Sequence, residues 1–177
     1  MVDDFINTMP KKNMQAEAAA SVYQDRLTKP SGSLGMLEDL AVFLAGWQNS
    51  KRPVIETAQA IIFAGNHGIC EQGVNPYPQE VTQRMVSNFE NGGAAMNQLC
   101  NLSGAELTVK PLSLDFPTQD FTQTKAMSMT ELLDAMSAGA KAVNRSANVI
   151  LLGEMGIGNS TVSSALAVSI FGGRVAD

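Results

Sequence analysis

Cysteine and histidine are scarce in this sequence. Its 177 residues hold two cysteines, Cys70 and Cys100, and one histidine, His67. No C-x-x-C pair occurs and the two cysteines are far apart, so neither a zinc site nor a disulfide scaffold is expected. We predict two reduced cysteines, buried or half-buried, and no metal site.

Basic runs and long apolar runs are also missing. The net charge is -5 and no long basic run occurs, which argues against a protein that tracks the phosphate backbone of nucleic acids. The N-terminal stretch "MVDDFINTMPKKN" has no apolar core of signal-peptide length, and no run approaches transmembrane length. We therefore expect a cytoplasmic protein with neither nucleic acid nor membrane as a partner. A small phosphorylated ligand, which needs only a few well-placed donors, is still allowed.

The composition fits a globular protein with a sizeable core, because 45% of the residues are hydrophobic. A first helix is predicted over 12–28. The 3-4-3 spacing of the apolar residues in "MLEDLAVFLAGWQ" predicts a second helix over 36–48. We assign 1–53 to an N-terminal helical segment of a small helical subdomain and 54–177 to a separate α/β domain.

Strands are predicted near 59–64, 106–112 and 148–152, with helices between them. The first and third are unbroken apolar runs, which is typical of strands buried on both faces of a parallel sheet. Ser128 and Glu131 have capping-box spacing before one of the helices. The predicted fold is therefore α/β, a parallel sheet with flanking helices in a Rossmann-like three-layer arrangement. In such sheets ligands bind at the carboxyl ends of the strands.

One loop that leaves such an end is rich in glycine. "LLGEMGIGNST", residues 151–161, has glycine at three of six positions after an apolar run, and a helix is predicted to follow it. Bare glycines let an anion approach backbone N–H groups, and a helix N-terminus adds partial positive charge. Ser160 and Thr161 offer hydroxyl groups for the ligand or for capping the helix. The alternative is a tight strand–helix turn without a ligand.

Two standard phosphate motifs do not fit this loop. Asn159 occupies the lysine position of the triphosphate-binding motif, and Thr161 stands where the dinucleotide motif requires its last glycine. Glu154 would repel a phosphate. Its carboxylate is compatible with the loop if it faces a sugar hydroxyl or a group that becomes cationic.

The second loop is "NHGICEQGVNPYPQ", after the first predicted strand. We interpret His67 as a structural histidine bonded to loop backbone, with catalysis as the alternative. Tyr77, Gln79 and Gln83 are candidates for a pocket that holds a flat aromatic ligand. The alternative for these three is an exposed turn and the first turn of a surface helix.

Three segments together resemble the nicotinate-nucleotide–dimethylbenzimidazole phosphoribosyltransferases of cobalamin biosynthesis. They are "LTKPSGSLGMLEDLA", "FAGNHGICEQGVNPYPQEVTQRMVSNFENGGAAMNQL" and "LLGEMGIGNST", in that order along the chain. The resemblance implies a homodimer that transfers phosphoribose from nicotinate mononucleotide to 5,6-dimethylbenzimidazole, releasing nicotinate and yielding α-ribazole 5'-phosphate. No cofactor is implied.

The resemblance also implies which residues form the site. The chemistry of the reaction adds Glu154 as the catalytic candidate, because a nearby carboxylate can stabilise an oxocarbenium-like ribose carbon or contact a ribose hydroxyl. Asn75, Tyr77, Gln79 and Gln83 match the segment that lines the benzimidazole pocket, although members commonly carry serine at the position of Asn75. Many carry aspartate at the position of Asn66. The phosphate and ribose site matches Gly153, Gly156, Ile157, Gly158, Asn159, Ser160 and Thr161.

Family chains continue well beyond the equivalent of Asp177. Their later half supplies a lysine near the phosphate and a glutamate that resembles the general base, and neither is among these 177 residues. Removing a general base typically costs roughly 10²- to 10⁴-fold in rate, so we expect the isolated chain to be nearly inactive. The alternatives to an enzyme are a non-catalytic module that binds a nucleotide or phosphate, and a folded remnant that only dimerises.

Overall fold

The computed structural model describes residues 8–173. It divides into two compact units with the boundary between Glu56 and Thr57. Residues 1–7, on which part of the signal-peptide expectation rests, and 174–177 lie outside the described residues. No helix in 8–173 has the length and the apolar character needed to cross a membrane. Both cysteines are free, Cys100 buried and Cys70 half-buried, as predicted.

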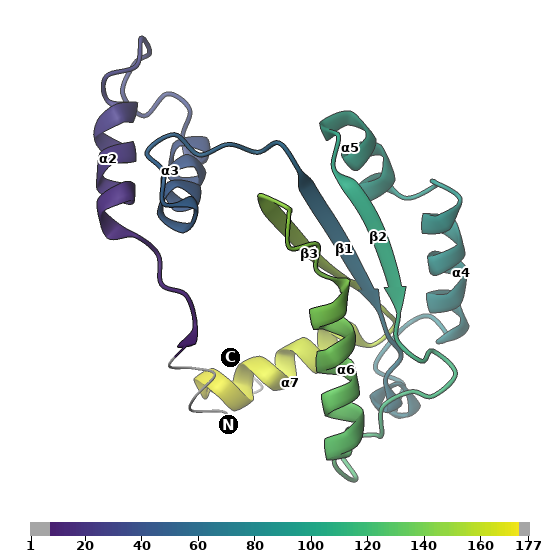
Figure 1. The fold of residues 1–177 in the computed structure, drawn as a ribbon. Helices are drawn as coiled ribbons and strands as arrows, with labels where there is room; N and C mark the ends of the chain where they lie inside the picture. The colour runs from purple at the N-terminus through teal and green to yellow at the C-terminus, as the bar shows by residue number, and fades with distance from the viewer. Residues whose placement is uncertain (1–7, 174–177) are drawn as a thin grey trace. The chain divides into compact units, whose positions relative to one another are not determined.

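The first unit contains two helices, α2 (Met14–Gln24) and α3 (Met36–Gln48), shown in Figure 1. The bounds of α3 are those predicted from its apolar spacing, whereas α2 is shorter than the predicted 12–28. The side chain of Asn13 sets the start of α2, because it accepts hydrogen bonds from two backbone N–H groups of the first turn at 2.8 and 3.1 Å.

The two helices approach each other closely at Gly46. This glycine is buried, and a Cβ atom added to it would lie only 2.7 Å from Cγ of Glu17. Its carbonyl oxygen accepts a hydrogen bond of 2.8 Å from the backbone N–H of Asn13. A larger residue at position 46 would therefore require the Glu17 side chain to move. Five large apolar side chains of α3 remain exposed in the structure: Met36, Leu37, Leu40, Phe43 and Trp47.

The second unit contains a parallel three-stranded sheet in the order β2-β1-β3. The strands are β1 (Ala58–Ala64), β2 (Glu106–Pro111) and β3 (Val149–Met155). The predicted parallel α/β architecture is confirmed, with one difference in extent. β3 continues past the predicted end at 152 and includes Gly153 and Glu154.

The core of the sheet is its central strand. Ala60, Ile61 and Ala64 of β1 are fully buried, as the apolar run predicts. The equally apolar β3 differs from expectation, because Leu151 is exposed and the side chain of Leu152 is 73% exposed. Adjacent strand residues point to opposite faces, so both faces of the sheet are open to solvent at β3 among the described residues.

Helices lie on both sides of the sheet. Figure 1 shows α4 and α5 next to β2, and α6 and α7 on the side of β3. A short 3-10 helix, η1, follows β1. The bounds are η1 (Gly68–Gln72), α4 (Glu80–Glu90), α5 (Ala95–Ser103), α6 (Met129–Ala142) and α7 (Asn159–Phe171).

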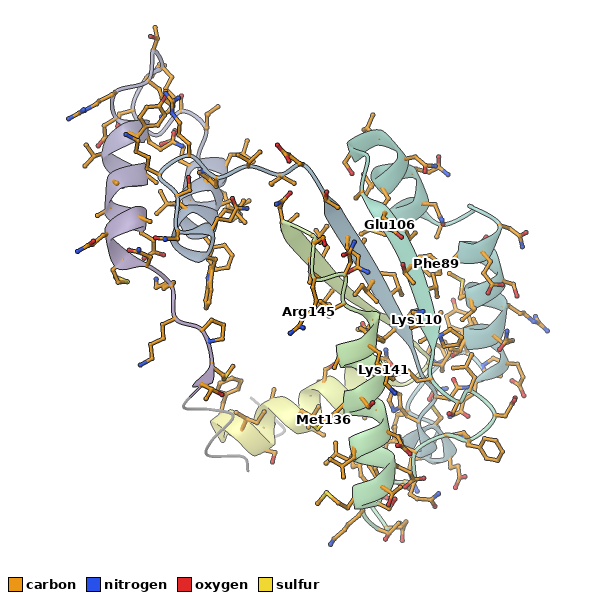
Figure 2. The ribbon with its side chains drawn as sticks, viewed as in Figure 1. Phe89, Glu106, Lys110, Met136, Lys141 and Arg145 are labelled. Carbon is orange, nitrogen blue, oxygen red and sulfur yellow. The ribbon has the colours of Figure 1, made fainter. Side chains whose placement is uncertain are left out.

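Helix α6 begins with the predicted capping box. Ser128 Oγ accepts from the backbone N–H of Glu131 at 3.3 Å, and the Glu131 carboxylate accepts from the Ser128 N–H at 2.7 Å. No residue of this helix is buried among the described residues. Met136, labelled in Figure 2, is 62% exposed, and Leu133 is exposed as well.

The segment between β2 and α6 is organised around Asp120, which is buried. Its carboxylate accepts hydrogen bonds from the backbone N–H of Thr122 at 2.9 Å and from the hydroxyl of the same residue at 2.8 Å. The side-chain amide of Gln72 donates a further bond of 2.7 Å from η1. The backbone N–H of Thr122 and then the Gln72 amide hold the pKa of Asp120 below its usual value, because both stabilise the ionised form.

Replacing Asp120 by asparagine should make stability less sensitive to acid. A carboxyl whose pKa is lowered in the folded state contributes stability above its unfolded pKa, and that contribution disappears as the pH falls through the folded pKa. The free energy of unfolding of the wild-type chain should therefore decrease more between about pH 6 and about pH 3 than that of Asp120→Asn. Urea titrations at several pH values measure this difference, and parallel curves for the two proteins would contradict it.

Candidate active site

Two loops leave the carboxyl ends of neighbouring strands and contact each other. β1 and β3 are in register and end together, with Ala64 opposite Met155. Directly beyond this pair, the backbone N–H of Gly65 donates to the Met155 carbonyl at 3.1 Å. The residues after β1, up to α4, and the segment 156–161 after β3, which we call the glycine loop, are therefore neighbours from their first residues onward.

His67 joins the two loops through its ring. Its Nε2 lies 2.7 Å from Oδ1 of Asn159, at the start of α7. Because an amide oxygen only accepts, Nε2 carries the proton in this arrangement. Nδ1 lies 3.5 Å from the hydroxyl of Thr118. The expected bonds from the ring to loop backbone are not present; its partners are two side chains from other segments.

Ile157, at the centre of the glycine loop, has both its backbone N–H and its backbone carbonyl hydrogen-bonded to side chains. Its N–H donates to Oγ1 of Thr82 on α4 at 3.1 Å, and its carbonyl accepts from Sγ of Cys70 at 3.3 Å. The side chain of Thr82 is completely buried. The N–H of Ile157, one of the predicted phosphate contacts, is thus already paired within the protein.

The glycines of this loop are required by its neighbour. A Cβ atom on Gly156 would collide with the carbonyl oxygen of Gly65. Gly158 has φ +93, a conformation that other residues rarely adopt, and a Cβ there would lie 2.8 Å from Sγ of Cys70. The close approach of the two loops therefore accounts for both glycines without reference to a ligand.

Three backbone N–H groups of the glycine loop are unpaired. Among the described residues, the backbone N–H groups of Gly156, Gly158 and Ser160 have no hydrogen-bond partner. Gly158 is the N-cap of α7 and no side chain caps the helix, so the hydroxyls of Ser160 and Thr161 do not take the capping role considered for them. Ser160 is exposed, Gly156 is half-buried and Gly158 is buried. Unpaired N–H groups at a helix start are chemically suited to an anion.

Glu154 lies in β3 and precedes the glycine loop. It pairs in register with Phe63 of β1, and its side chain is exposed. No described residue donates a hydrogen bond to its carboxylate or pairs with its charge. Gly153 also lies in the strand, packed over the side chain of Ile62. The carboxylate is therefore available to a ligand at the strand end and lies outside the turn that offers the free N–H groups.

Three of the four candidate base-binding residues line one or both of two cavities. Asn75 and Gln79 line a cavity of about 570 Å³, together with Asp120 and neighbouring residues. Gln79 and Gln83 line a second cavity of about 520 Å³. Tyr77 lines neither cavity and its side chain is 62% exposed. Residues 156–161 do not line either of these two cavities.

Two buried amide oxygens face this region without a partner. Asn75 donates through Nδ2 to the carbonyl of Tyr77 at 2.6 Å, and its Oδ1 is buried and unpaired among the described residues. Asn66 donates to the Leu114 carbonyl at 3.0 Å, and its Oδ1 is likewise unpaired. Both oxygens could accept a bond from a donor group on a ligand or a water molecule.

Sequence reasoning missed the contribution of Thr82. The available signal was its spacing, because Thr82 comes one helical turn after Gln79 and therefore shares a face of α4 with it.

Within 8–173 no group of three or more His, Cys, Asp or Glu side chains is placed to hold a metal ion.

Comparison with known proteins identifies the family. A family model described as "Phosphoribosyltransferase" matches residues 9–177. A nicotinate-nucleotide–dimethylbenzimidazole phosphoribosyltransferase of Rhodobacter capsulatus is 53% identical over 99% of this chain and 53% of its own length. The enzyme of that name from Ruegeria pomeroyi is 51% identical over 98% of this chain and 52% of its own length. The chain thus spans about half the length of these relatives.

A solved structure agrees with the sequence match. The crystal structure of the enzyme of the same name from Thermus thermophilus superimposes with a TM-score of 0.81 and 32% identity. The superposition covers 90% of this chain and 54% of the other. The fold, the family model and the relatives agree, and this chain belongs to the phosphoribosyltransferase family.

Proposed function

We propose that this chain carries part of the site that transfers phosphoribose from nicotinate mononucleotide to 5,6-dimethylbenzimidazole, in the biosynthesis of cobalamin. The observation that carries the proposal is the joining of two loops at the ends of β1 and β3, one with free N–H groups and one with the predicted base-binding residues. The proposal includes the cytoplasmic location expected from the sequence.

The glycine loop is the proposed phosphate site. The N–H groups of Gly156, Gly158 and Ser160 have no partner among the described residues, with Ser160 exposed and Gly158 buried, and the start of α7 adds partial positive charge. Ile157 has its N–H engaged by Thr82, so its role in the proposal is to fix the loop. The proposed phosphate and ribose segment also includes Gly153, Asn159 and Thr161.

Glu154 is the proposed catalytic carboxylate. The reaction breaks the bond between the ribose carbon and a positively charged nicotinate ring, and the ring leaves as a neutral group. The ribose carbon becomes oxocarbenium-like, and a carboxylate at the strand end would stabilise that charge or bind a ribose hydroxyl. The exposed and unpaired position of Glu154 supports this role.

The acceptor base has to lose its N–H proton when the new bond forms. His67 is a poor candidate for taking it, because both ring nitrogens face protein partners at 2.7 and 3.5 Å. The proposal therefore leaves the general base to groups outside these 177 residues. Asn75, Tyr77, Gln79 and Gln83 are proposed to hold the base.

A homodimer is part of the proposal. The outer edge of β3 has no partner strand among the described residues, and apolar side chains of α6 and α7 are exposed. Unpaired edges and apolar surfaces of this kind are normally covered by association.

Nicotinate mononucleotide should bind to the isolated chain through its phosphate. We expect calorimetry to detect binding, and a crystal soaked with the nucleotide should place the phosphate within hydrogen-bond distance of the N–H groups of Gly156, Gly158 and Ser160. Binding without turnover would support the alternative of a non-catalytic module. No binding at millimolar concentration would support a remnant that only dimerises.

Replacing Glu154 by glutamine should lower turnover more than substrate binding. The test uses a complete enzyme, made by joining this chain to the part of the Rhodobacter capsulatus relative that it does not span. Glutamine keeps the shape and removes the charge, and we expect kcat to fall by an amount equal to about 2–4 kcal/mol with little change in KM. Unchanged turnover would remove Glu154 from the mechanism, and an inactive unmodified fusion would contradict the proposed reaction.

The isolated chain should be dimeric at micromolar concentration. Light scattering should give twice the chain mass of 18.8 kDa. Leu152→Lys, at the most exposed apolar position of the β3 edge, should shift the mass toward the monomer, because a charge on this edge opposes strand pairing. A mass of 18.8 kDa for the unmodified chain would contradict the homodimer.

A further inference from the structure

The proposed reaction assigns no role to the buried hydroxyl group of Thr82. Thr82 has no exposed surface, yet its Oγ1 accepts the N–H of Ile157 at 3.1 Å across the interface between α4 and the glycine loop. A fully buried polar group is costly unless it is paired, and here its pairing satisfies the central N–H of that loop. Valine would fill the same volume without accepting the bond.

A second connection runs through His67. The side-chain amide of Gln79 donates to the backbone carbonyl of His67, and the ring of His67 donates to Oδ1 of Asn159 at 2.7 Å. Gln79 lines both cavities, and Asn159 is the first residue of α7. Hydrogen bonds thus connect the predicted base segment with the helix start at the predicted phosphate site.

The two connections are anchored on different sides of the glycine loop. Thr82 fixes the peptide between Gly156 and Ile157, and His67 fixes the side chain of Asn159, two residues further on. The free N–H group of Gly158 lies between these two points, and those of Gly156 and Ser160 flank them. An anion bound through these groups would need them held in one arrangement, since misplacement of donors weakens binding.

We propose that Thr82 and His67 are positioning residues for the anion site: they hold the glycine loop from the segment that carries the base-binding residues. They do not touch the substrate. The two hydrogen bonds support the effect on loop conformation whether or not a ligand binds, whereas the effect on anion affinity rests on the proposed function.

The test compares Thr82→Val with Thr82→Ser. Valine keeps the shape and removes the acceptor, and serine restores the acceptor with a smaller side chain. In Thr82→Val we expect the amide of Ile157 to exchange hydrogen at least about tenfold faster, because loss of a buried hydrogen bond destabilises the closed loop. Affinity for nicotinate mononucleotide, measured by calorimetry, should fall by about tenfold. Thr82→Ser should exchange and bind as the wild type does.

Exchange at Ile61 in the buried centre of β1 controls for general destabilisation. Faster exchange at Ile157 with unchanged exchange at Ile61 supports the proposal. Equal acceleration at both sites, or equal behaviour of the valine and serine variants, would overturn it. If the wild-type chain binds no nucleotide but exchange at Ile157 follows the expected pattern, the proposed function fails and the positioning role stands. If Thr82→Val binds as tightly as the wild type, the positioning role fails and the proposed function stands.

His67 offers an independent pair of variants. His67→Gln can still donate toward Asn159 from its terminal amide, whereas His67→Leu cannot. We expect the leucine variant to weaken nucleotide binding by about tenfold and to change the amide chemical shifts of residues 158–161, and the glutamine variant to recover most of both. Identical effects of the two substitutions would show that His67 acts only through packing, which would contradict its part in the proposal.

Discussion

The in-register pairing of β1 with β3 is the constraint on which the site depends. Parallel strands that run from Ala58 opposite Val149 to Ala64 opposite Met155 end at the same level, so their two loops emerge as neighbours. The register is also held at the opposite end, where Thr57 and Asn148 exchange two hydrogen bonds of 2.8 and 2.9 Å. A shift by one residue would break these bonds and turn the side chains of β3 to the other face.

The elements that the sequence predicts well are those with local causes. The apolar spacing of α3 and the reciprocal bonds of Ser128 and Glu131 at α6 involve residues within a few positions of each other. The unbroken apolar run of β1 also predicts its burial correctly. The same pattern in β3 does not, because Leu151 and Leu152 are exposed on opposite faces of the sheet, and what packs over a face is not a property of the strand's own sequence.

For the candidate site, the sequence predicts which segments form it. It does not predict why particular residues are needed at particular positions in those segments. The two loops that composition singles out do contact each other at the carboxyl ends of neighbouring strands. The glycines, however, are required where Gly156 meets the Gly65 carbonyl and Gly158 meets Cys70, contacts between residues distant in the chain. The hydrogen bond between Thr82 and Ile157 is also a tertiary contact, since 75 positions separate the two residues. Tertiary contacts of this kind leave no periodic pattern that a single sequence would reveal.

The close fit of Gly156 and Gly158 against Gly65 and Cys70 has a consequence for variation in this region. Since each loop forms the surface on which the other rests, the effects of substitutions in the two loops should be non-additive. A bulkier residue in one loop is tolerable only after its counterpart has moved or become smaller. Any exchange of ligand preference between relatives by grafting would therefore have to transplant both loops as one unit.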